Sequence, residues 1–115
     1  MNLQEFHGEN WVEEVLMNDL PVLVDFRGPG EIFNASEDAL LKEIQEDWRL
    51  PVRIGTLDAE LYPEVARTYH IPDFPTLVLF FGGEIQYTSW GLDRVRRMIS
   101  FWFKTSETTP VKIWN

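Results

Sequence analysis

The chain has 115 residues and no cysteine, and its 10 Lys and Arg residues stand against 19 Asp and Glu residues, for a net charge of −9. This length favours a single domain, and an apolar content of 44 % is enough to fill its core. The missing thiols exclude disulfides, thiolate metal sites and cysteine nucleophiles, while the acidic balance opposes nucleic-acid binding.

The sequence also bears on where the protein works. No apolar run approaches the ~20 residues that a membrane-spanning helix requires. The opening residues MNLQEFHGEN lack the basic and then apolar order of a signal peptide. We therefore expect a cytoplasmic protein that has neither a membrane nor a nucleic acid as its partner.

The first elements predicted along the chain are a helix and a buried strand. Asn10 and Glu13 have the spacing of a capping box, and apolar residues recur after them at helical intervals, which predicts a helix over 10–18. The segment 21–26 is short, β-branched and almost wholly apolar, as expected of a strand buried on both faces. The glycines and proline of 27–30 then predict a turn.

A second helix and strand follow. Asn34 and Glu37 have the capping-box spacing again, and they open a helix predicted over 34–48. The buried stripe of this helix is predicted to consist of Leu40, Leu41, Ile44 and Trp48. The segment 51–58 then has the apolar pattern of another strand.

The rest of the chain predicts two helices around a hairpin. Pro63 opens a short helix that ends near Tyr69, and 76–81 reads as a second fully buried strand. A Gly-Gly turn joins it to an alternating strand over 84–90, and Asp93 can cap a final helix. The element order βαβαββα predicts an α/β fold in which helices flank a mixed central sheet.

We expect one domain over residues 1–103 and a C-terminal tail over 104–115. The tail begins like a linker but ends in Val111, Ile113 and Trp114. These are large apolar residues, which are uncommon in a segment that makes no contacts. It therefore has three possible roles: docking on the domain itself, binding a partner, or forming oligomers by exchange between copies.

Several blocks of this sequence resemble the thioredoxin family. They fall in the family's order and spacing and cover residues 5–103. The blocks are PVLVDF at 21–26, residues 58–71, FPTL at 74–77, FGGE at 81–84, and Gly91. The resemblance implies a thioredoxin-like fold in which Pro75 follows a cis peptide bond and faces the family's active site.

The sequence departs from the family at the residues that carry its chemistry. Counted without gaps, the two active-site cysteines fall on Glu31 and Asn34, and the motif between them becomes Glu31-Ile32-Phe33-Asn34. A carboxylate or an amide cannot replace a thiolate in attack on a disulfide. The thiol–disulfide reaction of the family is therefore excluded for this chain.

Asp25 matches a buried aspartate that, in the family, assists proton transfer at the cysteines. The family often pairs it with a lysine on the next strand, where this chain has Ile54. A buried carboxyl without a cation should have a raised pKa. Asp25 is then either a general base directed at the loop of Glu31, or a residue without a chemical role, or one that hydrogen-bonds to the start of the helix.

The resemblance also implies a binding groove beside the cis-proline, because family members hold extended segments there. Matched residue by residue, its rim would be Gly30, Glu31, Ile32, Phe33, Leu57, Phe74, Pro75, Trp90 and Gly91. Exposed apolar side chains favour an interaction site. The alternative is that Phe33 and Phe74 pack on each other and fill space.

The leading hypothesis is thus a redox-inactive protein-binding module, chaperone-like or an assembly factor, with no catalytic residues and a protein or extended peptide as partner. The alternative is a small-molecule binder or an acid–base enzyme that uses Asp25 and Glu31 as paired carboxylates. A third reading is a structural subunit that works through its tail. His7 and His70 have no partner at metal-ligand spacing, so we expect no metal and no cofactor.

Overall fold

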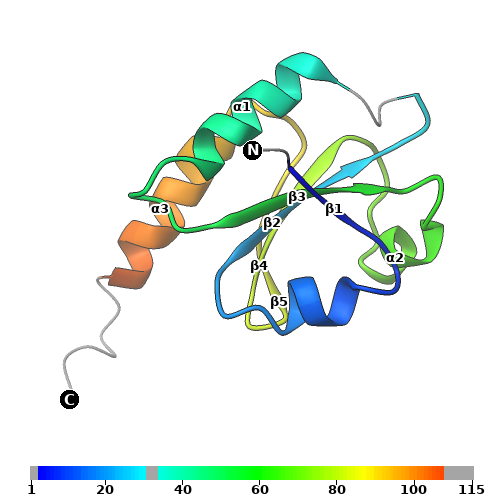
Figure 1. Cartoon of the computed structure of the whole chain (residues 1–115), viewed down its shortest axis with the longest axis horizontal. Coiled ribbons are helices and arrows are strands. Elements are labelled where there is room, and N and C mark those ends of the chain that lie inside the picture. Colours follow the sequence, from blue (N-terminus) through cyan, green and yellow to red (C-terminus); the bar gives the residue numbers. More distant parts are fainter. Residues whose placement is uncertain (1–2, 31–33, 108–115) are drawn as a thin grey trace.

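The computed structural model describes residues 3–30 and 34–107, which fold around one five-stranded sheet (Figure 1). The strands are β1 (Gln4–Phe6), β2 (Val22–Arg27), β3 (Arg53–Asp58), β4 (Thr76–Phe81) and β5 (Glu84–Ser89). The helices are η1 (Val12–Leu16, a π-helix), α1 (Ala35–Gln45), α2 (Pro63–Thr68) and α3 (Val95–Glu107).

The sheet is mixed, with the strand order β1-β3-β2-β4-β5. β1 and β2 pair with β3 in parallel, whereas β4 pairs antiparallel with both β2 and β5. From β2 to α3 the elements follow the order βαβαββα, which confirms the fold predicted from the sequence; β1 and η1 precede them. Helices α1 and α3 cover one face, and η1 and α2 cover the other (Figure 1).

The alternation of side chains along β2 divides the core in two. Val22, Val24 and Phe26 point to the η1 and α2 face, where they join one apolar cluster. Leu23 points to the α1 and α3 face and joins the other. Because side chains alternate along a strand, Asp25 and Arg27 also face α1, inside the protein. Both charged side chains therefore lie against the start of a helix.

The first predicted capping box does not form. The Asn10 side chain folds back and accepts a hydrogen bond from the His7 backbone N–H at 2.8 Å. No side chain caps the helix that follows, which is the short π-helix η1 over 12–16 and not the predicted helix over 10–18. The asparagine instead closes the turn that connects β1 to this helix.

The second predicted helix is shorter than expected, and its stripe is wrong at one position. α1 ends at Gln45, and Trp48 is 86 % exposed. A turn ends the helix here, because the Asp47 carboxylate accepts a hydrogen bond from the Arg49 backbone N–H at 3.0 Å. Leu50 takes the place in the core that the helical spacing assigned to Trp48.

The hairpin and the last helix follow the expected path. Gly82 and Gly83 have φ values of 63° and 81°, a left-handed pair that a two-residue hairpin turn needs. α3 continues to Glu107, four residues past the predicted domain boundary at residue 103, and 108–115 lie outside the described residues. No helix in the described part of the chain is both long and apolar enough to cross a membrane.

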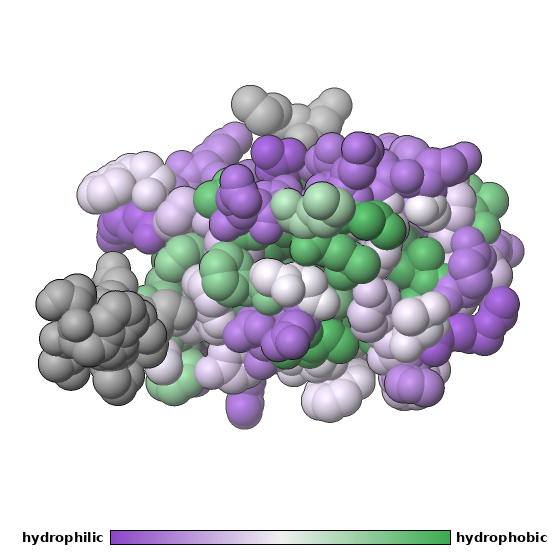
Figure 2. All heavy atoms as spheres, turned by 90° about the horizontal axis from the view of Figure 1, so that it is seen from below, coloured by the Kyte–Doolittle hydropathy of each residue, from purple (hydrophilic) through white to green (hydrophobic). Residues whose placement is uncertain are grey.

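Some large apolar side chains reach the surface. Figure 2 shows apolar side chains among polar ones on the side that carries η1, where Val12, Met17 and Leu20 are exposed. Others lie on β5, on α3 and in the loop between them: Ile85, Trp90 and Phe101. The second group lies beside β5, the last strand in the sheet order.

Candidate functional site

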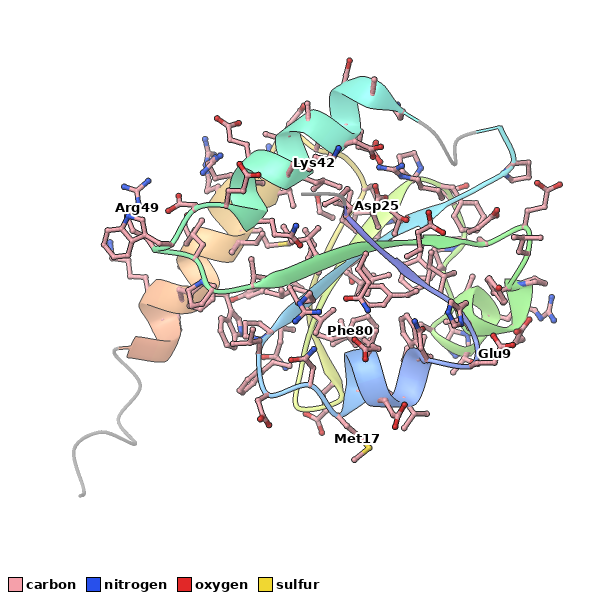
Figure 3. The ribbon with its side chains drawn as sticks, viewed as in Figure 1. Glu9, Met17, Asp25, Lys42, Arg49 and Phe80 are labelled. Carbon is pink, nitrogen blue, oxygen red and sulfur yellow. The ribbon has the colours of Figure 1, made fainter. Side chains whose placement is uncertain are left out.

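The most unusual feature of the interior is a guanidinium surrounded by carboxyls. The Arg27 side chain is 1 % exposed, and its Nε lies 2.9 Å from Asp25 Oδ2 and 3.0 Å from Glu37 Oε1. Its Nη2 donates to Asp38 Oδ1. Asp25 is fully buried and Glu37 is nearly so, while Asp38 is partly exposed. We call these four residues the Arg27 cluster (Figure 3 labels Asp25).

Two elements bring the cluster together. Asp25 and Arg27 are two residues apart on β2, so they share a face of the sheet. Glu37 and Asp38 lie in the first turn of α1, where the helix dipole also favours acidic side chains. The helix begins here because the side chain of Asn34 accepts a hydrogen bond from the Glu37 N–H at 3.0 Å. Asn34 is therefore a helix cap, and the side chain of Glu37 binds Arg27.

Burial raises the pKa of Asp25 from 3.8 to about 9, with further upward contributions from a hydrogen bond to Glu37 and from its negative charge. The guanidinium of Arg27 opposes this rise but does not cancel it. Asp25 Oδ1 has no hydrogen-bond partner among the described residues, and a buried carboxyl oxygen without a donor disfavours the charged form. The expected raised pKa agrees with this, whereas the expectation that Asp25 lacks a cation was wrong.

Sequence reasoning missed Arg27, although a signal was present. The resemblance implies a cation on the next strand, but the residue at that position is Ile54, which belongs to the apolar core. The i, i+2 spacing of Asp25 and Arg27 on a predicted strand would have placed them on one face. The cation therefore comes from the same strand as the carboxyl.

The cluster reaches the surface at a cleft of about 450 Å³ beside the carboxyl ends of β1 and β3. We call it the carboxyl-end cleft. Its polar lining is Glu5, His7, Arg27, Asp38, Lys42, Thr56, Asp58 and Tyr62. The His7 ring lies against Tyr62, and its Nδ1 is 3.0 Å from Glu9 Oε1. Within the described ranges, no three His, Asp or Glu side chains come together as metal ligands would.

The predicted groove is only partly assembled from exposed residues. Glu31, Ile32 and Phe33 lie outside the described residues. Leu57 is fully buried in the η1 and α2 core, so its assignment to the rim was wrong. Its side chain alternates with Thr56 and Asp58, which face the other side of the sheet, and so it points into the core. Gly30 is exposed, in a left-handed conformation with φ 79°.

Phe74 lies against the backbone of Gly28. A Cβ atom added to Gly28 would stand 2.8 Å from Phe74 Cδ2, so only glycine leaves room for the ring. Phe74 is half-buried and packs on the η1 and α2 core. The peptide bond from Phe74 to Pro75 is cis, as the resemblance implies, and Pro75 is half-buried.

Of the predicted rim residues that the structure describes, Trp90 is the exposed aromatic side chain, with 66 % of its surface accessible. It sits in a turn just after β5, between Ser89 and Gly91. The Ser89 hydroxyl donates to the Gly91 carbonyl at 2.7 Å and accepts from the Gly91 N–H at 3.4 Å. These bonds close the turn, so the indole is held outside the core by a defined backbone.

No family model matches the chain. A thioredoxin of Rickettsia bellii is 32 % identical over 93 residues, which cover 81 % of this chain and 89 % of the relative. The chain belongs to the thioredoxin family. A thioredoxin of Porphyra purpurea is 35 % identical over 88 residues, covering 73 % of this chain and 78 % of its own. A designed protein of known structure aligns with a TM-score of 0.78 at 20 % identity, over 90 % of this chain and 99 % of its own, which supports the fold alone.

This thioredoxin-family chain has no thiol with which to attack a disulfide. Asn34 caps α1, and Asp25 belongs to a buried ion cluster. What this thioredoxin-family member shares with its family is the fold, and its own peptide bond before Pro75 is cis.

Proposed function

We propose that this chain is a redox-inactive binding module, chaperone-like or an assembly factor, that holds an extended protein segment. The segment would lie at the end of the sheet where Gly30, Pro75 and Trp90 are found. β2 and β5 both run toward this end, and β4 begins there.

The exposure of Trp90 is the observation that carries this proposal. A tryptophan that is 66 % exposed leaves a large apolar area in water, and the Ser89 hydroxyl keeps the turn closed around it. Tryptophans of this kind are frequent anchors of protein interfaces, because their rigid rings bury a large area at little entropic cost. A preformed turn lowers the cost of ordering further.

A second candidate function rests on the carboxyl-end cleft, whose lining carries charges of both signs. A small polar molecule with both an amino and a carboxylate group would suit it. The acid–base reaction of Asp25 with Glu31 ranks lower, because Asp25 is fully buried and its raised pKa makes it an acid at neutral pH. An unfolding temperature that rises when free amino acids are added to the wild type, but not when they are added to Lys42→Ala, would favour this second candidate.

Capture of proteins from a lysate of the source organism tests the leading proposal. The baits are the wild type, Trp90→Ala and Trp48→Ala. Trp48 is the matched control, because it is also exposed, at 86 %, but lies between α1 and β3 at the opposite end of the sheet. We expect proteins captured by the wild type to be retained by Trp48→Ala and lost by Trp90→Ala. Equal capture by all three baits would overturn the proposal.

A further inference from the structure

The edge of the sheet at β5 has a free side. β5 lies last in the strand order, and β4 is its one strand neighbour among the described residues. A strand edge presents backbone N–H and C=O groups that another extended chain can pair with. An interaction surface at this edge would go beyond the single anchor at Trp90.

Helix α3 is set so that part of it lies beside β5. Val95 and Ile99 face the sheet and are fully buried. Arg94, Arg97, Met98 and Phe101 follow the i, i+3, i+4, i+7 spacing of one helical stripe, and all but the half-buried Met98 are exposed. The Phe101 ring lies edge-on to Tyr87 of β5, at 6.1 Å between centroids. This stripe forms a wall beside the free strand edge.

Between this wall and β5 lie two adjoining clefts of about 440 and 290 Å³, which share Tyr87, Arg94 and Met98. We call them together the β5–α3 groove. Tyr87, Thr88 and Ser89 all line it, although consecutive strand residues point to opposite faces. The groove therefore follows the backbone edge of β5, and at one end it reaches Trp90 and Gly91.

The charged side chains that line the groove are Asp93, Arg94 and Arg97, so its net charge is +1 on a chain of net charge −9. Arg94 and Arg97 are exposed and form no ion pair with any residue that the structure describes, whereas their neighbour Arg96 lies 3.5 Å from both Glu43 and Asp47. Two unpaired cations beside an apolar cleft, on a protein of net charge −9, are complementary to carboxylates.

We propose that the β5–α3 groove binds an extended segment of a partner protein in which every second residue, on the face turned toward α3, is apolar and acidic in turn. The segment adds to β5 as a sixth strand: its backbone pairs with the free edge, its apolar residues cover Met98 and Phe101, and its carboxylates meet Arg94 and Arg97. This inference rests on the proposed function and extends the site from Trp90 along the strand.

Charge argues against the two other occupants. The chain's own residues 108–115 contain Lys112 and no Asp or Glu, so this segment would bring a cation toward the arginines. A second copy paired antiparallel through β5 would bring two α3 helices together on one face. Its own Arg94 and Arg97 would then face those of the first copy, and like charges repel.

The test uses a fluorescein-labelled synthetic peptide of eight residues that repeats Val-Thr-Glu-Thr, so that Val and Glu share one face of the added strand, and its binding is followed by anisotropy at low salt. The matched probe has Lys in place of Glu. We expect the glutamate peptide to bind, Arg94→Glu/Arg97→Glu to weaken it about tenfold or more, and Arg67→Glu, an exposed arginine on α2, to leave it unchanged. Amide NMR shifts should concentrate on 85–89 and on α3.

Four results would overturn the inference. The first two are equal affinity for the Glu and Lys peptides, and no binding up to millimolar peptide. The third is tighter peptide binding after Trp114→Asp, which would show that the chain's own end occupies the groove. The fourth is a dimer of the wild type that Phe101→Ser abolishes, which would show a second copy there. Capture of proteins from a lysate separates this inference from the proposed function. If Trp90→Ala loses the captured proteins and the double arginine variant keeps them, this inference alone is wrong. If the double arginine variant loses them and Trp90→Ala keeps them, the proposed site at Trp90 is wrong.

Discussion

Arg27 donates through Nε to the carboxyl group of Asp25, two residues earlier on the same buried strand, at 2.9 Å. Neither side chain is more than 1 % exposed. Burying the charge of the guanidinium costs free energy unless other groups complete its hydrogen bonds. Glu37 and Asp38, from the start of α1, supply that completion for the guanidinium. These contacts therefore fix the start of α1 to the carboxyl end of β2.

Loss of Arg27 should be costly. Arg27→Met keeps the length of the side chain but leaves Asp25 and Glu37 facing each other without their cation. We expect the free energy of unfolding, measured by urea denaturation, to fall by about 3–5 kcal/mol. Arg49→Met is the control, because Arg49 pairs with Asp47 at the surface and should matter little. A loss for Arg27→Met no larger than the control's would contradict a structural role for the cluster.

Stability should depend on pH through Asp25. The unfolded chain releases this proton above pH 3.8, whereas the folded protein keeps it up to about pH 9. The folded state therefore binds more protons across this window, and the free energy of unfolding should decrease as the pH rises from about 4 to about 9. Urea denaturation at several pH values measures this slope.

Asp25→Asn isolates the contribution, since an amide has nearly the shape of the carboxyl and cannot lose a proton. We expect its stability to change less than that of the wild type over the same pH range. Asp47→Asn should leave the decline in place, because a hydrogen bond from Arg49 lowers the pKa of Asp47. An NMR titration that places the pKa of Asp25 near the ordinary aspartate value of about 3.9 would refute the rise.

Much of this fold could be predicted because its signals are local. The buried strands over 21–26 and 76–81 and the Gly82–Gly83 turn carry their signals in a few consecutive residues, and all three appear in the structure. Trp48 was misplaced because periodicity cannot show where a helix stops. Its end depends on the turn that Asp47 closes, and apolar spacing does not encode that turn.

The end of α2 carries a conformational cost that can be removed. His70 has φ 55°, and its N–H donates to the Arg67 carbonyl while the Ile71 N–H donates to Ala66, which together make a Schellman motif. This motif favours glycine, because a side chain strains the left-handed backbone. His70→Gly should raise the free energy of unfolding by about 1 kcal/mol. His70→Ala should bring no such gain, and an equal gain from both would point to the imidazole instead.

Gly28 should not tolerate even a methyl group. Alanine there would bring Cβ to 2.8 Å from the Phe74 ring, and overpacking of this kind costs about 1–3 kcal/mol. Gly91→Ala is the matched control, because no atom lies within 4 Å of its added Cβ. Thermal unfolding of both variants, and of Gly28→Ala with Phe74→Leu, would show whether the ring is the cause. If the smaller side chain restores no stability, the clash is not with Phe74.

The candidate site was harder to predict than the fold, because it depends on which residues meet across elements. Asp25 and Asn34 were found by matching the family, yet their contacts to Arg27 and Glu37 arise from a strand and a helix packed together. Leu57 was assigned to the rim by position alone, and the alternation along β3 places it in the core. The placement of a residue in a family motif therefore did not decide what it touches here.

The Arg27 cluster also restricts how this sequence can diverge. Substitution of Arg27 alone leaves the Glu37 carboxylate without its cation inside the protein, and most such variants should be lost. Joint replacement by apolar residues of similar volume removes the penalty, since buried ion pairs are often no more stabilising than a well-packed core. In descendants of this chain these positions should therefore be inherited as a set, either all charged or all apolar.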